Sequence, residues 1–232
     1  MFAKAGDDGE RAQAAYGVGL VKLNRGDEPG ALAAFQRAHG FNPRSSKINY
    51  RLGIAYRMAK KPDEALRHLE MVLDRNGLHE AAAYNVAMAW TQKKDAAKVK
   101  EWKRRHREIR DARVKLAGFR ARLTERPGDA LLLRNIAEIL LEFGNHDEAV
   151  GVWRAVRAQA STDAEVVYKY ALCLFHVGDY FASRTQLEQA MRLDPELKEA
   201  QALHDRIMAE FHGGERKVEA PGATRVDEDG DS

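Results

Sequence analysis

The chain of 232 residues is 44% hydrophobic and 31% charged, so it can bury a core but carries too many charges for a membrane protein. Alanine fills 37 positions and proline only 6, a balance that favours closely packed helices over sheets. The sequence has no run of 18 apolar residues, no apolar signal-peptide core near its start and one cysteine, which excludes an internal disulfide framework. We therefore expect a cytoplasmic protein, or an extracytoplasmic one if the chain is a trimmed mature fragment.

A period of 34 residues runs through the chain, and it separates Tyr16, Tyr50 and Tyr84 as well as Gly144 and Gly178. In chain order, the period predicts a flexible N-terminus over residues 1–11 and then a helical solenoid over residues 12–212. Five repeats and a capping helix make up the predicted solenoid, over residues 12–45, 46–79, 80–129, 130–163, 164–197 and 197–211. Residues 213–232 are rich in acidic side chains and are predicted to form a disordered tail.

Each repeat has the pattern of a helix, a short turn and a second helix. Ile48, Leu52 and Tyr56 recur at the spacing of an amphipathic helix, and Pro62 begins the next helix after a short break. Small residues share one phase in all five repeats, namely Gly19, Gly53, Ala87, Ala137 and Ala171. We expect the two helices of each hairpin to approach closely there, because larger side chains would hold them apart.

The third repeat departs from the period. From Glu80 to Ala130 the chain runs for 50 residues, which is 16 more than the period. Residues 95–126 have a continuous helical pattern without proline, which is consistent either with one elongated helix or with an additional separate helix that breaks at Gly118. We favour the elongated helix, because an additional helix would reverse the alternation of inner and outer helices before the fourth repeat.

The net charge of +3 hides a strongly basic segment. Residues 93–126 contain fourteen Lys or Arg and five acidic residues, a net charge of +9, so the rest of the chain sums to −6. Candidate anion-binding residues in this basic helix are Lys100, Lys103, Arg104, Arg105, Arg107, Arg110 and Arg113. The segment is either a docking surface for nucleic acid, acidic lipid or an acidic protein segment, or a solvated helix face whose charges partly pair with one another.

These features resemble the tetratricopeptide repeat family, whose pattern combines Leu-Gly, an aromatic residue, Ala, Phe and a closing Pro. The first repeat carries Gly19, Phe35 and Pro43 at the matching places, and the second carries Gly77 instead of the closing Pro. The resemblance covers residues 12–197 and implies an all-α, right-handed superhelical solenoid of helix-turn-helix repeats. It also implies a concave groove, lined by the first helix of each repeat, which holds an extended peptide or a partner helix.

Large side chains occur at one phase of these first helices, and tyrosine suits a protein-binding surface because it combines contact area with a polar tip. The predicted groove residues are Tyr16, Leu20, Tyr50, Arg51, Ile54, Tyr84, Asn85, Met88, Arg134, Asn135, Tyr168, Lys169 and Leu172. The amides of Asn85 and Asn135 can both donate to and accept from a peptide backbone. The alternative interpretation is that the tyrosines only fill space between adjacent inner helices.

No catalytic, metal or cofactor site is predicted, because Cys173 and His176 have no third catalytic partner and the histidines lack zinc-site spacing. The sequence therefore predicts a non-catalytic scaffold or adaptor that binds a protein or peptide. The alternative function is an anion-binding accessory protein that uses the basic helix, residues 93–126, for nucleic acid or an acidic membrane surface. A homodimer formed through Trp102, Ile109 and Leu116 on the long helix is a third interpretation.

Overall fold

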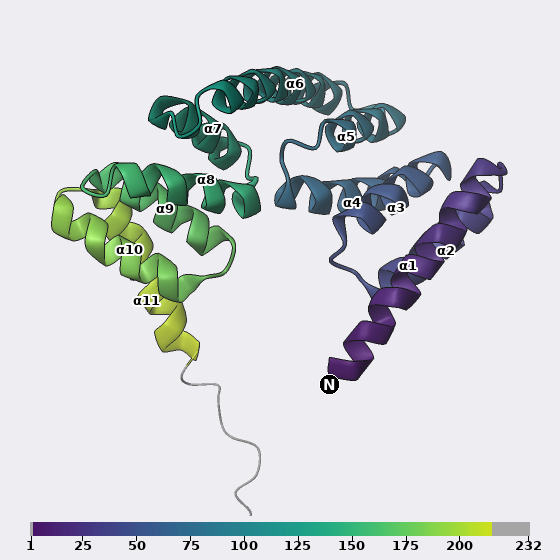
Figure 1. Ribbon diagram of the computed structural model, residues 1–232. Helices are drawn as coiled ribbons and strands as arrows, with labels where there is room; N and C mark the ends of the chain where they lie inside the picture. Colours follow the sequence, from purple (N-terminus) through teal and green to yellow (C-terminus); the bar gives the residue numbers. More distant parts are fainter. Residues whose placement is uncertain (1, 215–232) are drawn as a thin grey trace, which may run out of the picture. The chain divides into compact units, whose positions relative to one another are not determined.

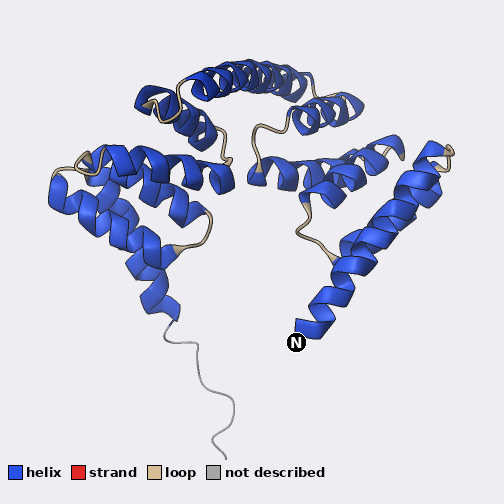
Figure 2. Ribbon diagram, viewed as in Figure 1, coloured by secondary structure: helices blue, strands red, loops and turns tan. Residues whose placement is uncertain are grey.

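The computed structural model describes residues 2–214, and all regular secondary structure within this range is helical (Figures 1 and 2). Eleven helices follow one another in the described range: α1 (Phe2–Asn24), α2 (Glu28–Phe41), α3 (Ser46–Met58), α4 (Pro62–Arg75), α5 (Glu80–Gln92), α6 (Ala96–Glu125), α7 (Ala130–Glu142), α8 (His146–Gln159), α9 (Ala164–His176), α10 (Tyr180–Leu193) and α11 (Lys198–Gly214). They pack in sequential pairs, which confirms the predicted all-α repeat array.

The chain divides into two compact units, and the boundary between Ala155 and Val156 falls inside α8. In the first unit α1 pairs with α2, α3 with α4 and α5 with α6, and successive pairs contact one another. In the second unit α9 pairs with α10, and α11 packs against α10 at the end of the array. The repeat pattern of the sequence predicts one solenoid and gives no sign of this division.

Local sequence signals set the helix ends. The side chain of Asp95 accepts a hydrogen bond from the Lys98 backbone N–H at 2.9 Å and caps α6, as expected for an acidic residue at a helix N-terminus. The turn between the two helices of a repeat needs one residue with a left-handed backbone. The residues with positive φ in these turns are Gly26, Lys60, Lys94, Gly144 and Gly178. Glycine suits this conformation, whereas Lys60 and Lys94 adopt it at an energetic cost.

The small residues of the repeats serve the predicted close approach. A Cβ atom on Gly19 would lie 2.5 Å from Cε1 of Phe35, and one on Gly53 would lie 2.7 Å from Cγ of Leu69. Neither distance is compatible with a side chain. The two helices of these hairpins are therefore held together by glycine on the first helix and a large apolar side chain on the second.

The extended segment of the third repeat is a single helix, α6, which confirms the favoured interpretation (Figure 1). Ile109 and Leu116 of this helix are buried, and Trp102 packs against the core of the first unit. The predicted homodimer face was therefore wrong, because these three side chains belong to the protein's own core.

The chain then returns toward the second repeat. The turn between α7 and α8 meets the loop between α4 and α5, where a Cβ on Gly77 would overlap the carbonyl oxygen of Phe143. Arg75 also pairs with Asp147 at 3.6 Å. This close approach explains why glycine replaces the closing proline at Gly77.

The first helix extends over the N-terminal segment. Residues 1–11 are predicted to be flexible, and α1 runs from Phe2 to Asn24. The predicted acidic tail begins inside α11, which ends at Gly214, and residues 215–232 lie outside the described residues. Within the described range, no helix is both long enough and apolar enough to cross a membrane.

Candidate functional site

Three tyrosines of the first unit occupy equivalent positions but differ in exposure. Tyr16 is only 3% exposed, and Nζ of Lys47 on α3 lies 4.6 Å from its ring centroid. Tyr50 is half-buried, with its ring centroid 4.7 Å from that of His79, the residue that caps α5. Tyr84 is 50% exposed. A residue at the start of the next first helix, Lys47 on α3 or the α5 cap His79, therefore lies against each of the first two tyrosines, whereas Tyr84 is accessible.

Tyr84 is exposed, and so is the residue at the start of α7 that is the counterpart of Lys47. Leu131 is the second residue of α7, as Lys47 is of α3, and Leu131 is 69% exposed. Because α6 is 16 residues longer than the period requires, the start of α7 is carried along α6 by about 24 Å, at about 1.5 Å per residue. Tyr84 and Leu131, the counterparts of Tyr16 and Lys47, are thus both left exposed.

Leu20, Ile54 and Met88, the predicted groove residues that follow the three tyrosines by one helical turn, are half-buried. Arg51 lies over the ring of Tyr50 at 5.9 Å. The prediction for Asn85 was wrong: it is buried, accepts a hydrogen bond from Nε of Arg57 at 3.0 Å and donates one to the carbonyl of Ala81 at 2.7 Å. Its amide is therefore occupied within the protein and does not face a ligand. Tyr16 is likewise a core residue.

The remaining predicted residues lie on later helices. Arg134 and Asn135 are half-buried on α7. In the second unit, Tyr168 and Leu172 pack against the core formed by α9, α10 and α11, and burial raises the pKa of the Tyr168 hydroxyl. Lys169 pairs with Glu165 at 2.9 Å. The candidate site thus consists of residues of the first unit only.

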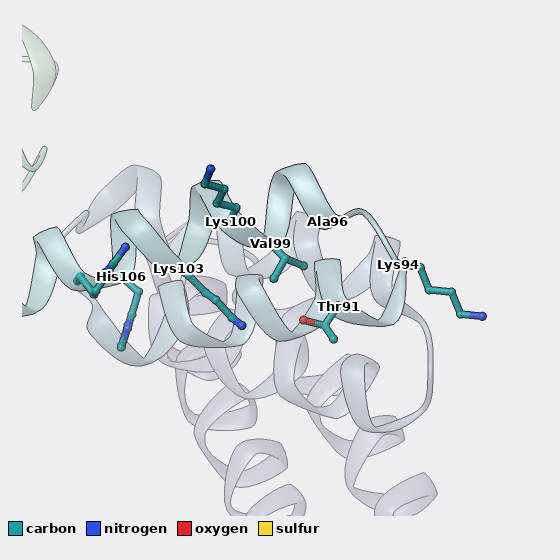
Figure 3. Close-up of a pocket in the computed structure, with 8 residues that line it drawn as sticks. Thr91, Lys94, Ala96, Val99, Lys100, Lys103 and His106 are labelled. Atoms are coloured by element: carbon teal, nitrogen blue, oxygen red, sulfur yellow. The ribbon is translucent and has the colours of Figure 1, made fainter.

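A pocket of about 750 Å³ lies along α6 and the turn that precedes it (Figure 3). Its lining residues are Thr91, Lys94, Ala96, Val99, Lys100, Lys103, His106 and Arg107. In Figure 3, Lys94 and Lys100 point in different directions, so the cations border the pocket and do not converge on one point. This arrangement suits several separated negative charges better than a single small anion.

A second pocket, of about 570 Å³, adjoins the first because His106 lines both. Tyr84 lines this second pocket, and its ring centroid lies 5.9 Å from that of His106. The carboxylate of Glu80 lies here too, 3.6 Å from Nε2 of His106 and 3.4 Å from Nε of Arg113. We refer to the residues that line these two pockets as the open face of the third repeat.

The cations of the basic helix fall into two groups. Arg104 pairs with Glu108 at 2.7 Å, and Arg110 with Asp111 at 3.6 Å. The guanidinium group of Arg105 lies 5.1 Å from the ring centroid of Trp102. For the cations of the first pocket, no carboxylate of the described residues lies within 4.0 Å of Lys94, Lys100, Lys103 or Arg107. Three cations of α6 without a carboxylate partner, and Lys94 from the preceding turn, thus lie on the open face, while Lys115 and Arg122 farther along α6 also have no carboxylate of the described residues within 4.0 Å.

The 34-residue period explains why this face is polar. Lys103 stands where the first two repeats carry Phe35 and Leu69, both of which are fully buried. Lys103 is exposed and is therefore not part of the hairpin core. The side chains that α6 contributes to the core of the first unit are those of Trp102 and Ile109. The helix therefore presents a different face to its own hairpin from that of α2 and α4.

Nine residues of the open face were not predicted from the sequence, namely Asn76, His79, Glu80, Ala81, Thr91, Lys94, Ala96, Val99 and His106. The available signal was the same period, because His106 stands where Ala38 and Val72 are fully buried. A polar residue at a position that is buried in other repeats therefore indicates a surface that no neighbouring helix buries.

Within the described residues, no group of three or more His, Cys, Asp or Glu side chains is arranged to hold a metal ion. Cys173 is buried and is not part of a disulfide. The open face offers positive charge, an aromatic ring and two adjoining pockets, which are means of binding a partner.

Comparisons with known proteins identify the repeats. Models of the tetratricopeptide repeat family match residues 49–77 and residues 134–198. No curated protein matches the chain.

Among solved structures, YrrB, described as a tetratricopeptide repeat protein with an unusual peptide-binding site, is 17% identical with a TM-score of 0.39, and the alignment covers 88% of this chain and 97% of YrrB. A thermophilic tetratricopeptide repeat protein of Thermus thermophilus is 16% identical with a TM-score of 0.37, over 85% of this chain and 99% of that one. MamA is 14% identical with a TM-score of 0.39, over 93% and 100%. From the two family-model matches, the chain is a tetratricopeptide repeat protein.

Proposed function

We propose that this chain is a non-catalytic scaffold that binds a peptide or a partner helix on the first unit, with the open face of the third repeat as its main contact. Tetratricopeptide repeat proteins typically mediate protein and peptide binding and are generally not catalytic.

The half-exposed Tyr84 carries the proposal. The equivalent Tyr16 and Tyr50 contact residues at the start of α3 and α5, so a protein surface is the usual neighbour of this position. Tyrosine contributes a large contact area at a low cost in side-chain entropy and keeps a polar hydroxyl for hydrogen bonding. The half-buried Met88 follows one turn later on α5 and extends the apolar surface.

Peptide selection tests this function and requires no identified partner. Peptides from a random displayed library are selected on the full chain, and their affinities are then measured for wild type and Tyr84→Ala. We expect Tyr84→Ala to weaken the selected peptides by about tenfold or more, as for an aromatic residue at the centre of an interface. Phe181→Ala is a matched control, because Phe181 is an exposed aromatic residue on α10 in the second unit. Equal affinities for wild type and Tyr84→Ala would contradict the proposal.

A second candidate function follows from the unpaired cations of the first pocket. The chain would then be an accessory protein that binds nucleic acid or an acidic membrane surface through the basic helix. Affinity for phosphates falls steeply with salt, whereas a complex on an apolar groove changes little between about 50 and 300 mM. Binding of duplex DNA or anionic vesicles that disappears over this range, without detectable peptide binding, would favour this second function.

A further inference from the structure

We propose that the open face of the third repeat binds an acidic amphipathic helix of a partner protein, which takes the place that the next repeat's first helix occupies in the regular repeats. This inference rests on the proposed scaffold function and specifies the chemistry of the partner.

The fold itself indicates that the ligand is a helix. In the first two repeats the corresponding face is covered by α3 and by the start of α5, through contacts such as Lys47 on Tyr16 and His79 on Tyr50. In the third repeat the start of α7 lies farther along α6, and the residues that line the two pockets belong to α5, α6 and the segments that immediately precede these helices. A helix of a partner would therefore meet a surface with the geometry of a contact between repeats.

The positive charge of the open face indicates that the ligand is negatively charged. Lys94, Lys100, Lys103 and Arg107 border the first pocket without a carboxylate from the described chain within 4.0 Å. In the second pocket, by contrast, Glu80 already lies beside Arg113 and His106. A bound helix should thus place its acidic residues over the first pocket. Opposite charges across an interface raise the association rate and exclude partners of the wrong sign.

Apolar groups on the same face favour a protein helix over nucleic acid or a membrane surface. Val99 lies on the wall of the first pocket, and Tyr84 lies on the wall of the second. A helix with one acidic and one apolar face satisfies both at once, whereas a phosphate backbone would use only the cations. The cations also border the pocket in different directions (Figure 3), which matches carboxylates spaced along a helix.

The test uses synthetic peptides of about 15 residues, about 22 Å long when helical, and fluorescence anisotropy with the full chain. The first peptide is helix-forming, with glutamates on one face and leucines on the other. The second has the same composition in an order that destroys the two faces, and the third carries lysine in place of glutamate. Duplex DNA and vesicles with about one fifth phosphatidylserine are measured in parallel, because these represent the two competing kinds of occupant.

Two double variants carry the same change of charge on α6. K100E/K103E reverses two cations of the first pocket, whereas K115E/R122E reverses two exposed cations of α6 that line neither pocket. We expect K100E/K103E to weaken the acidic amphipathic peptide by about tenfold or more and to gain affinity for the lysine peptide. K115E/R122E should keep the wild-type affinity within about twofold, because screening limits the effect of distant charges. Helical circular dichroism checks the fold of both variants.

Three results would overturn the inference. One is an equal loss in both double variants, which would indicate attraction to the whole basic helix. Another is equal binding of the first two peptides, which would remove the need for an apolar face. The third is tighter binding of DNA or vesicles than of the peptide, with the same sensitivity to K100E/K103E.

Failure of this inference can be told apart from failure of the scaffold function. If selected peptides depend on Tyr84 but bind K100E/K103E as they bind wild type, the acidic helix is wrong and the scaffold function stands. If neither the selected peptides nor the acidic peptide depends on Tyr84, both proposals are wrong.

Discussion

Tyr84 stands in the third repeat where Tyr16 stands in the first, yet Tyr84 is 50% exposed whereas Tyr16 is 3% exposed. Lys47 of the second repeat lies over Tyr16, while Leu131, its counterpart in the fourth repeat, is itself exposed. The length of α6 accounts for this difference, because it shifts the start of α7 along the helix. A long helix in a repeat protein can thus expose a surface that shorter repeats would bury.

The two tyrosines should differ in their contribution to stability. Tyr16→Ala removes a buried ring that packs against Phe35 at 5.8 Å, and we expect it to lower the free energy of unfolding by about 3 kcal/mol. Tyr84→Ala should lower it by less than about 1 kcal/mol, because half of this side chain is already in water. Urea denaturation followed by circular dichroism measures both values. Similar losses for the two variants would contradict the assignment of Tyr84 to an uncovered face.

Replacement of Lys60 by glycine should stabilise the protein. Its φ of 58° is left-handed, and the equivalent turn position in the first repeat is Gly26. We expect Lys60→Gly to stabilise the protein by about 0.5 to 1 kcal/mol, because relief of backbone strain exceeds the entropy that glycine adds to the unfolded chain. Ala59→Gly is the control, since Ala59 has a φ of −71° and should lose stability through the added entropy of the unfolded chain. A lower melting temperature for Lys60→Gly than for wild type would show that the lysine side chain outweighs the strain.

Two glycines should respond oppositely to alanine. Gly118 lies within α6, and a Cβ there would have no atom within 4 Å, so Gly118→Ala should stabilise the protein by about 0.5 to 1 kcal/mol. Gly53→Ala should destabilise it by about 1 to 3 kcal/mol, because its Cβ would lie 2.7 Å from Cγ of Leu69. Chemical denaturation of both variants tests the pair. Destabilisation by Gly118→Ala would mean that α6 bends or opens at this residue.

His68 should make the fold sensitive to acid. Its ring is stacked on Tyr56 and its Nδ1 lies 2.8 Å from Oδ1 of Asn49. Burial, with smaller effects from the charges of His39 and Arg67, lowers the pKa of His68 to about 4. The folded state therefore favours neutral His68, and its contribution is present above the unfolded pKa of about 6.5 and is lost as the pH falls toward 4.

When the pH is lowered from 7 to 5, the loss of this contribution from His68 should decrease the free energy of unfolding by about 2 kcal/mol. Urea denaturation across this range measures the effect. His68→Gln keeps a hydrogen-bonding partner for Asn49 and cannot titrate, so it should flatten the pH dependence. An unchanged slope in His68→Gln would assign the acid sensitivity to other groups.

Much of the fold follows from the sequence because a repeat encodes the same local contacts several times. The period located the hairpins, and the small residue at Gly53 predicted the close approach to the second helix, which the contact with Leu69 demonstrates. The uninterrupted pattern through Gly118 predicted one long helix, and α6 is continuous there. These features depend on neighbours within one repeat.

The candidate site was harder to predict because it depends on contacts between repeats. Asn85 has the residue type of a peptide clamp, but Arg57, from the preceding repeat, occupies its amide oxygen. From the sequence, Trp102 and Ile109 could form a homodimer face. In the structure, α6 is rotated so that both side chains pack in the core of the first unit. The basic character of α6 was evident from the sequence, whereas the concentration of unpaired cations around Lys103 required the three-dimensional structure.

Site-specific cross-linking tests the central claim most directly, that the open face of the third repeat binds the partner. A photoreactive phenylalanine derivative is placed at Tyr84 or, as a control, at Val114, which is an exposed residue of α6 that lines neither pocket. After irradiation with the acidic amphipathic peptide, we expect efficient cross-linking from position 84 and little from position 114. Cross-linking from position 114 that equals or exceeds that from position 84 would contradict this claim.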